Sequence, residues 1–408
     1  MIRNKNKFFV VFTLVFISTS LIYLALSRDS FAKNGTIINP KEQAEIQLLI
    51  KEFIQKEARR EIKSPEQIRE ENKKLLQDAN IDFSVRETIK YCASKNINCG
   101  PGIIDVDSEI TFKEMERIEG SRIKVEAEEH RTWYYGDRTI GEGICPHSFI
   151  LAEEDGVWEI EKFEDGCEIK ARPLTEEEKR LPPSPLLEEM INRQTIYLWR
   201  MKEISPEELQ YLERMKEIFP EMEIEYEKPK EINLQGKDNI VSLSSSYSYN
   251  RSNAGWYGWY YALNPNSDFR YFSLDCTNFI SQAIWYGNWP WVGWWPNITS
   301  TSVWWYAFNW MGESRTWRIA SYWWRFIYNR PRGWLANSFC YLQKGDIVQI
   351  DYDRNGYSDH SMIVTYKNGC DVRMSYHTAN TRNRSIWSIY NESPNATYSI
   401  WRLYDYAN

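Results

Sequence analysis

The tryptophans of this 408-residue chain are concentrated in its C-terminal part. Sixteen of the nineteen lie between Trp256 and Trp401, and residues 246–408 carry a net charge of +4, whereas the residues before them total −11. At about 100–200 residues per domain, the length allows two or three domains, and each could bury a core of its own. The sequence therefore predicts two bodies of different composition.

The overall composition limits the classes of protein to which the chain can belong. It is 42% hydrophobic and 26% charged, which excludes a collagen-like repeat and a fully disordered chain. The net charge of −7 argues against a nucleic-acid-binding protein, because phosphate backbones are recognised by clustered positive charge.

Residues 1–32 have the three parts of a secretory signal: a basic start, an apolar run over residues 8–26, and a small-x-small end at Ala32. The 19-residue apolar run is also long enough to span a bilayer core of about 30 Å. The segment predicts either a cleaved signal peptide or a retained membrane anchor. In both cases we expect a secreted or cell-surface protein.

Seven cysteines in an exported chain predict disulfides and one thiol that lacks a partner within the chain. Cys145 and Cys167 lie about equally far from a predicted hairpin turn at 155–156, so they can face each other on paired strands. Cys92 and Cys99 can close a short loop. Both pairings are hypotheses, because sequence does not fix connectivity.

Before the aromatic body, the chain changes from a helical to a strand pattern. Residues 40–80 place apolar side chains at helical spacing, and residues 85–170 alternate as strands do. Such a helix followed by antiparallel strands resembles the small cystatin-like and NTF2-like modules. The expected order of parts is an α+β accessory module over 40–172, a charged helical segment over 173–226, a polar linker over 227–246 and the aromatic body over 247–408.

Within the aromatic body, Cys276 is placed at the start of a predicted helix, and antiparallel strands follow over residues 345–377. A helix start favours the thiolate, which is the nucleophilic form, and its N–H groups can hold an oxyanion. His360 and His377 lie in the same body and could exchange a proton with the thiol. Considered singly, each has a structural alternative: a disulfide for Cys276, a surface position for His360 and a core position for His377.

These residues belong to four short motifs: DCTNFISQ at 275–282, GDIVQ at 345–349, DHSMIVT at 359–365 and YHT at 376–378. Together with Tyr249-Asn250-Arg251 upstream, they resemble the putative amidase domain family of Gram-positive bacteria, which is similar to the NlpC/P60 and CHAP peptidases of the papain-like superfamily. The resemblance covers residues 247–408 and nothing before them.

The resemblance implies an α+β papain-like domain, in which a catalytic cysteine at a helix start packs on an antiparallel sheet. It assigns Cys276 as nucleophile and His360 as base. The third residue, which orients the base, is best matched by His377, with Asn380 as the other candidate. Asp275 is expected to cap the helix. The implied function is an exported cysteine amidase or peptidase, a hydrolase that cleaves amide bonds in cell-wall (peptidoglycan) peptides and needs no cofactor.

Two further patterns suggest other functions. Residues 351–359 mimic the first nine positions of a calcium loop, but Met362 occupies the position of the bidentate glutamate, so we expect a turn at Asn355-Gly356 and no metal site. The tryptophans could stack on sugars or fill a core, and the sequence favours neither. The alternative functions are thus a non-catalytic cell-surface binding or adhesion protein with a tryptophan-rich surface, and a scaffold that acts through its acidic helices.

Overall fold

The computed structural model describes residues 38–119, 121–167, 169–184, 247–307, 312–330 and 332–407. The predicted signal or anchor over 1–32, the linker over 227–246 and most of the charged segment lie outside the described residues. Among the residues that are described, no helix is both long enough and apolar enough to cross a membrane.

The described chain forms two compact units. Unit 1 comprises the residues up to 60, 106–132 and 144–168, and unit 2 comprises 61–105, 133–143 and 169–408. Unit 2 therefore includes residues 61–105, 133–143 and 169–172 of the expected 40–172 module in addition to the aromatic body.

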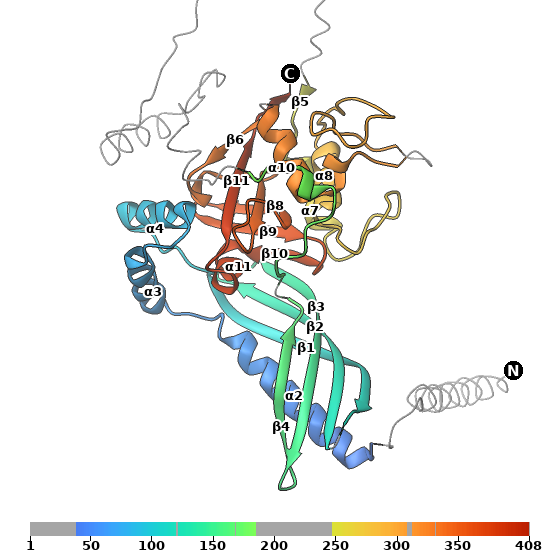
Figure 1. Cartoon of the computed structure of the whole chain (residues 1–408). Coiled ribbons are helices and arrows are strands. Elements are labelled where there is room, and N and C mark those ends of the chain that lie inside the picture. The colour runs from blue at the N-terminus through green and yellow to red at the C-terminus, as the bar shows by residue number, and fades with distance from the viewer. Residues whose placement is uncertain are drawn as a thin grey trace, which may run out of the picture. The chain divides into compact units, whose positions relative to one another are not determined.

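Unit 1 packs helix α2 (Pro40–Arg59) against antiparallel strands (Figure 1). The strands are β1 (Ile103–Arg117), β2 (Arg122–Tyr135), β3 (Ile140–Glu154) and β4 (Val157–Asp165). The helix begins with a capping box, in which Asn39 accepts from the backbone of Glu42 and the Glu42 side chain accepts from the backbone of Asn39. Its buried side chains Ile46, Ile50 and Ile54 follow the predicted helical spacing.

The β3–β4 hairpin of unit 1 confirms both the predicted turn and the predicted disulfide. Glu154 pairs with Val157, and the two residues between them have positive φ angles of 52° and 79° at Asp155 and Gly156. A two-residue turn of this kind matches the twist of the strands, and glycine adopts the second position without steric cost. Cys145 and Cys167 form a disulfide.

Unit 2 is built on an antiparallel sheet with the strand order β3–β10–β9–β8–β7–β11–β6, to which β3 contributes its first residues. The new strands are β6 (Gly333–Ala336), β7 (Ile347–Asp351), β8 (His360–Asn368), β9 (Asp371–Tyr376), β10 (Thr381–Ser385) and β11 (Thr397–Leu403), and β5 (Tyr247–Ser248) pairs separately with β12 (Tyr406–Ala407). The α-helices are α3 (Pro65–Gln77), α4 (Phe83–Lys95), α7 (Arg251–Tyr260), α8 (Cys276–Tyr286), α9 (Arg315–Arg318), α10 (Ala320–Asn329) and α11 (Ile386–Glu392), and the short 3-10 helices are η1 (Glu178–Arg180) and η2 (Phe339–Tyr341).

The two faces of this sheet carry different cores because side chains alternate along each strand. Ile347 and Ile363 pack with α7, α8 and α10 on one face. Val348 and Met362 pack with α4 and α11 on the other. The structure is thus a mixed α/β arrangement on an antiparallel sheet, and helix α8 covers one face of it (Figure 1).

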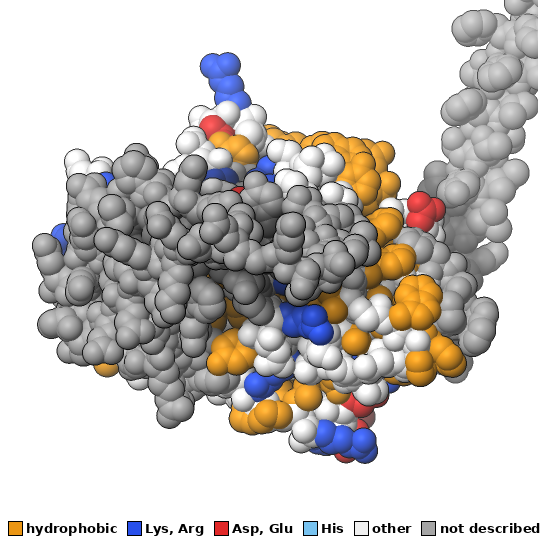
Figure 2. Space-filling model, turned by 90° about the horizontal axis from the view of Figure 1, so that it is seen from above, with side chains coloured by type: hydrophobic (Ala, Val, Ile, Leu, Met, Phe, Trp, Pro, Cys, Tyr) orange, Lys and Arg blue, Asp and Glu red, His pale blue; other side chains and the backbone are white. Residues whose placement is uncertain are grey.

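Nine of the sixteen described tryptophans of unit 2 fill its core, although the sequence left this open. The following are at most 2% exposed: Trp133, Trp289, Trp304, Trp305, Trp317, Trp323, Trp324, Trp387 and Trp401. Trp256, Trp259, Trp294 and Trp295 are 39–48% exposed. Figure 2 shows hydrophobic side chains gathered in patches on the described part of one face, with few acidic ones among them.

The disulfides of unit 2 leave Cys276 as the free cysteine. Cys92 and Cys99 form the predicted disulfide, and Cys340 and Cys370 form another. Cys276 is the free cysteine, and an odd number of cysteines requires that one lacks a partner within the chain. Its side chain is buried.

Candidate active site

The first turns of α8 are fixed by hydrogen bonds that use almost every polar side chain of residues 275–282. The Thr277 hydroxyl lies 3.0 Å from that of Ser361, on β8. Asn278 donates to the Arg270 carbonyl at 2.8 Å and accepts from the indole of Trp317 at 2.8 Å. These bonds explain the polar residues at buried positions, because a buried polar group is stable only when it is paired.

The second turn of α8 continues this pattern. The Ser281 hydroxyl accepts from the indole of Trp304 at 3.1 Å, and the Gln282 side chain accepts from the Tyr257 hydroxyl at 2.7 Å. The polar side chains of residues 275–282 therefore fix the position of α8 in the fold. Cys276 is the residue among them that carries a thiol outside a disulfide.

Cys276 lies where α8 meets the backbone of β8. Its sulfur lies 3.7 Å from the Thr277 hydroxyl, and the Thr277 hydroxyl and the backbone of Ser361 both act to lower the pKa of the thiol. The side chain is 6% exposed, and burial raises the pKa of the thiol, with a further rise from Asp275 and an opposing effect of Arg172. The expectation of a lowered pKa is thus wrong for this state of the protein, because desolvation outweighs the helix start.

His360 is the residue before Ser361 and begins β8. Side chains alternate along the strand, so the Ser361 hydroxyl faces α8, whereas the imidazole packs on the opposite side, edge-on to the Tyr376 ring at 5.0 Å. Burial lowers the pKa of His360 to about 3, so the ring is neutral. Its Nε2 is buried without a hydrogen-bond partner among the described residues, and no hydrogen bond there joins it to Cys276.

His377, the expected orienting residue, is engaged elsewhere. Its Nδ1 lies 2.6 Å from an Asp275 carboxylate oxygen and its Nε2 lies 2.8 Å from the Tyr261 carbonyl. The ring also stacks on Phe279 at 4.0 Å. Each ring nitrogen already lies within hydrogen-bond distance of an oxygen atom, so neither is left for His360. This geometry gives His377 a structural role beside the start of α8 and not the orienting role.

Asp275 does not cap α8 with its side chain, contrary to expectation. One of its carboxylate oxygens accepts from the Phe272 backbone at 3.0 Å and from Asn278 at 2.8 Å, and the other binds His377. The carboxylate therefore links the loop before α8 to the turn after β9.

Asn380, the other candidate for the third role, lies in the turn after β9. Because β9 runs antiparallel to β8, the end of β9 lies beside the start of β8, where His360 is located. The Oδ1 atom of Asn380 is buried and has no hydrogen-bond partner among the described residues. Asn380 therefore carries a buried acceptor without a donor at the end of the sheet where His360 begins β8.

The Gly-Asp and Tyr-Asn-Arg motifs support the fold away from Cys276. Asp346 is fully buried and accepts from Arg251 at 2.5 Å and from the Leu403 backbone at 3.0 Å. The Tyr249 hydroxyl donates to the carbonyl of Gly345 at 2.6 Å, and Gly345 has a φ of 85°, which favours glycine. The two motifs therefore join the start of α7 to the turn before β7.

The calcium-like loop between β7 and β8 satisfies its acidic side chains internally. Asp351 accepts from the backbones of Asn355 and Gly356 at 3.1 and 2.8 Å, and Asp359 accepts from that of Tyr352 at 2.9 Å. Burial and the neighbouring carboxylates raise the pKa of Asp351 to about 7 and that of Asp359 to about 6.

Sequence reasoning missed the contribution of residues 169–184. Arg172 lies close enough to Asp359, the residue before His360, to oppose the rise in the pKa of that carboxyl, and its guanidinium binds Glu178 at 2.6 and 2.7 Å. Arg172 is also near enough to lower the pKa of the Cys276 thiol. No local signal predicts this proximity, because the segment lies about a hundred residues from Cys276 along the chain and matches none of the motifs.

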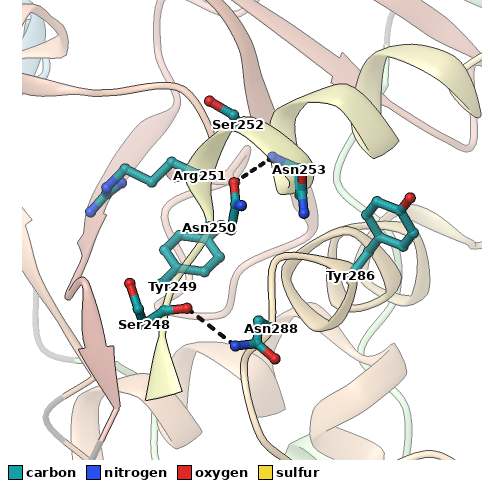
Figure 3. Close-up of a pocket in the computed structure, with 8 residues that line it drawn as sticks. All are labelled: Ser248, Tyr249, Asn250, Arg251, Ser252, Asn253, Tyr286 and Asn288. Atoms are coloured by element: carbon teal, nitrogen blue, oxygen red, sulfur yellow. Dashed lines mark hydrogen bonds between the residues drawn. The ribbon is translucent and has the colours of Figure 1, made fainter. Parts of the chain in front are cut away.

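A polar hollow lies near the other end of α8 (Figure 3). It is lined by residues 248–253 together with Tyr286 and Asn288. Trp256 stacks on Tyr260 at 5.0 Å and lies 5.7 Å from the Tyr286 ring, and all three are more than 40% exposed. The hollow is therefore bordered by exposed aromatic rings.

Comparisons with known proteins locate a family only in the C-terminal part. No solved structure matches the chain. It is 26% identical over 170 residues to the uncharacterized protein YjcM and 29% identical over 185 residues to the uncharacterized protein YhbB, both of Bacillus subtilis (strain 168). These matches cover 38% and 42% of this chain, and 38% and 55% of the respective relatives. Residues 248–401 match the family described as putative amidase domain, which indicates an amidase-type hydrolase function on a peptide-like substrate for this part of the chain.

Proposed function

We propose that residues 247–408 act as a cysteine amidase or peptidase with a papain-like arrangement, in which Cys276 is the nucleophile and His360 the base. One observation carries the proposal: a free thiol starts helix α8 and lies 3.7 Å from the Thr277 hydroxyl, which is itself 3.0 Å from the hydroxyl of Ser361, the residue after His360. His360 is favoured over His377 because its Nε2 has no partner among the described residues, whereas both nitrogens of His377 are in use.

The proposed reaction proceeds in two steps. In the arrangement described above, the His360 ring lies on the side of β8 away from α8, so the first step requires the ring to turn toward the sulfur. His360 takes the thiol proton, the sulfur attacks the amide carbonyl, and the protonated ring gives its proton to the leaving amine, which leaves a thioester on Cys276. His360 then takes a proton from water, the resulting hydroxide attacks the thioester, and the thiol and a carboxylic acid are released. N–H groups at the start of α8 are suited to hold the oxyanion in both steps.

Asn380 is proposed as the residue that orients His360. Its unpaired Oδ1 can accept from the Nε2–H of the neutral ring, which would leave Nδ1 to receive the thiol proton. The hydrogen bond between Asn380 Oδ1 and His360 Nε2 is not formed in the structure. Catalytic hydrogen bonds often tighten only when substrate binds.

Cell-wall peptide is the proposed substrate, and the outside of the cell is the proposed location. The predicted signal or anchor over residues 1–32 supports export. So do the three disulfides, because such bonds persist in oxidising compartments.

The test is amide cleavage by the full chain on purified peptidoglycan peptides. Cys276→Ala should lower turnover by about a thousandfold or more, because the nucleophile is lost. The protein should keep its unfolding temperature within a few degrees. Turnover that survives in this variant would exclude Cys276 as nucleophile.

A binding role has one observation of its own, which is the aromatic-bordered hollow of Figure 3. Exposed flat rings beside asparagine and serine side chains are suited to stack on a sugar and bond its hydroxyls. If binding is the function, Trp256→Ala should weaken the affinity for soluble cell-wall glycan about tenfold, and Cys276→Ala should leave it unchanged.

A further inference from the structure

Residues 169–184 form a described segment of unit 2 that contacts the elements around Cys276, and we call it the strap. Near its start, Arg172 lies close enough to Asp359 to oppose the rise in the pKa of that carboxyl. Near its end, the Leu181 carbonyl accepts from Tyr357 at 2.6 Å and the Ser184 backbone donates to Gly356 at 2.6 Å. The strap is therefore held at both ends by the loop that leads into His360.

The middle of the strap is held by α9 and α10. The Glu177 carboxylate pairs with Arg315 at 2.5 Å, and the fully buried Glu178 accepts from the Ser321 hydroxyl. Ser321 follows Ala320, whose carbonyl is bonded by Gln349, and Gln349 in turn donates to the Ser361 hydroxyl. Hydrogen bonds through α10 and Gln349 thus connect the strap to Ser361 on β8, the strand that packs against α8.

Access to the site is closed in this arrangement. Cys276 is 6% exposed and His360 is 1% exposed, whereas an amide substrate must bring its carbonyl carbon into contact with the sulfur. Burial also keeps the proton on the thiol and off the imidazole, so neither group is in the ionised form of a reactive pair.

The strap also supplies the carboxylate that pairs with the Arg315 guanidinium, and a substrate carboxylate could take its place. Arg315 is 21% exposed, and its carboxylate partner among the described residues is Glu177. The neighbouring Arg318 is paired instead with Glu313, so it remains neutralised without the strap. Arg315 lies on α9, whose Trp317 bonds Asn278 in the first turn of α8, and displacement of the strap would leave it without the carboxylate of Glu177.

We propose that the strap is an acidic pseudosubstrate that keeps Cys276 closed, and that Arg315, once released from Glu177, binds a carboxylate of an anionic peptide substrate. This inference rests on the proposed function of Cys276. The strap would open when a substrate carboxylate competes with Glu177 or when the chain on either side of the strap is cut.

The experiment compares three full-length proteins. The loosened variant Glu177→Ala/Tyr357→Phe removes two contacts made by the strap and changes no residue of the catalytic machinery. The control variant Lys179→Ala removes an exposed lysine of the strap that pairs with Glu176 within the strap. The third protein is the unmodified chain. Two rates are measured: alkylation of Cys276 by iodoacetamide, followed by mass spectrometry, and cleavage of a glutamate-containing peptide amide.

We expect the loosened variant to alkylate about ten times faster than the unmodified chain, because two hydrogen-bonded contacts are lost. Cleavage should rise by a similar factor, and Lys179→Ala should change neither rate. Equal alkylation in all three folded proteins would overturn the closing role. Faster alkylation without cleavage of any amide would support the closing role and count against the proposed function instead.

The carboxylate site has its own readout in the loosened variant. Adding Arg315→Ala should raise KM about tenfold for the glutamate peptide, with kcat little changed, and should leave KM unchanged for the glutamine analogue. Equal effects on the two peptides would overturn the assignment of Arg315.

Discussion

Two histidines lie near the start of α8, and the regions around them differ in how completely their polar atoms are paired. Around His377, the ring, Asp275 and Asn278 all have hydrogen-bond partners, and Phe279 covers the ring. Around His360, the Nε2 atom and the Oδ1 atom of Asn380 are buried without partners in the described structure.

We interpret the region around His377 as structural, because its polar atoms are paired. The region around His360 contains polar atoms that are free to bind a substrate or exchange a proton. A buried polar atom without a partner destabilises the folded state by about 1–3 kcal/mol, so it requires an explanation such as a ligand, a catalytic role or a second conformation. Proximity to the nucleophile alone does not identify the base, because His377 is bonded directly to the residue before Cys276.

The largest expected effect is on catalysis. His360→Ala should lower kcat about a thousandfold, because it removes the general base, and the protein should remain folded. The measurement is single-turnover cleavage together with thermal unfolding. A variant with near-normal kcat would remove His360 from the mechanism and end the comparison.

His377→Ala should instead act on stability. Two buried hydrogen bonds and the packing on Phe279 are lost, so the free energy of unfolding should fall by about 2–4 kcal/mol in urea titrations. The kcat of the fraction that remains folded should change little. A thousandfold loss of kcat with unchanged stability would exchange the roles of the two histidines.

Asn380→Ala should have a smaller catalytic effect. Loss of an orienting acceptor should lower kcat about tenfold to a hundredfold, and Asn380→Asp should restore part of it because the acceptor is kept. A shift in the pH dependence of kcat would distinguish orientation of His360 from a purely structural role. Equal activity of Asn380→Ala and the unmodified protein would remove the residue from the site.

The smallest effect is on the pH dependence of stability. The pKa of His360 is near 3 in the folded state and about 6.5 in an unfolded chain, so the unfolded state takes up the proton first as the pH falls. Its contribution to stability is therefore present above pH 6.5 and is lost toward pH 3. Between pH 7 and pH 4.5, the unfolding temperature of His360→Gln should fall a few degrees less than that of the unmodified protein.

Asp351 and Asp359 oppose this trend, because their raised pKa values make stability fall as the pH rises from about 4 to 7. They are present in both proteins, so their effect cancels in the difference between the two curves. Parallel curves would show that His360 is not buried and neutral in solution.

Local signals in the sequence predicted several elements correctly. Apolar spacing gave helix α2, the Asp155-Gly156 turn gave the β3–β4 hairpin, and the strand pattern after Gly345 gave β7 to β9. Each of these depends on residues within one or two turns or strands, where periodicity and turn chemistry decide the conformation.

Contacts between distant segments could not be predicted in this way. The roles of His360 and His377 depend on which ring nitrogen meets an acceptor, and a shift of one residue along a strand moves a side chain to the other face. The closing of the site depends on the strap, which lies about a hundred residues before Cys276 and follows no periodic pattern.

The sequence alone determined that one of seven cysteines would lack a partner in the chain and placed Cys276 at a helix start, because counting and local helix signals suffice for both. Only the tertiary structure decided that this thiol is buried and protonated, that His377 is bonded to Asp275, and that acidic residues of the strap pair beside the site. Desolvation and ion pairing depend on which distant groups surround a side chain, and that is settled only when the whole chain has packed.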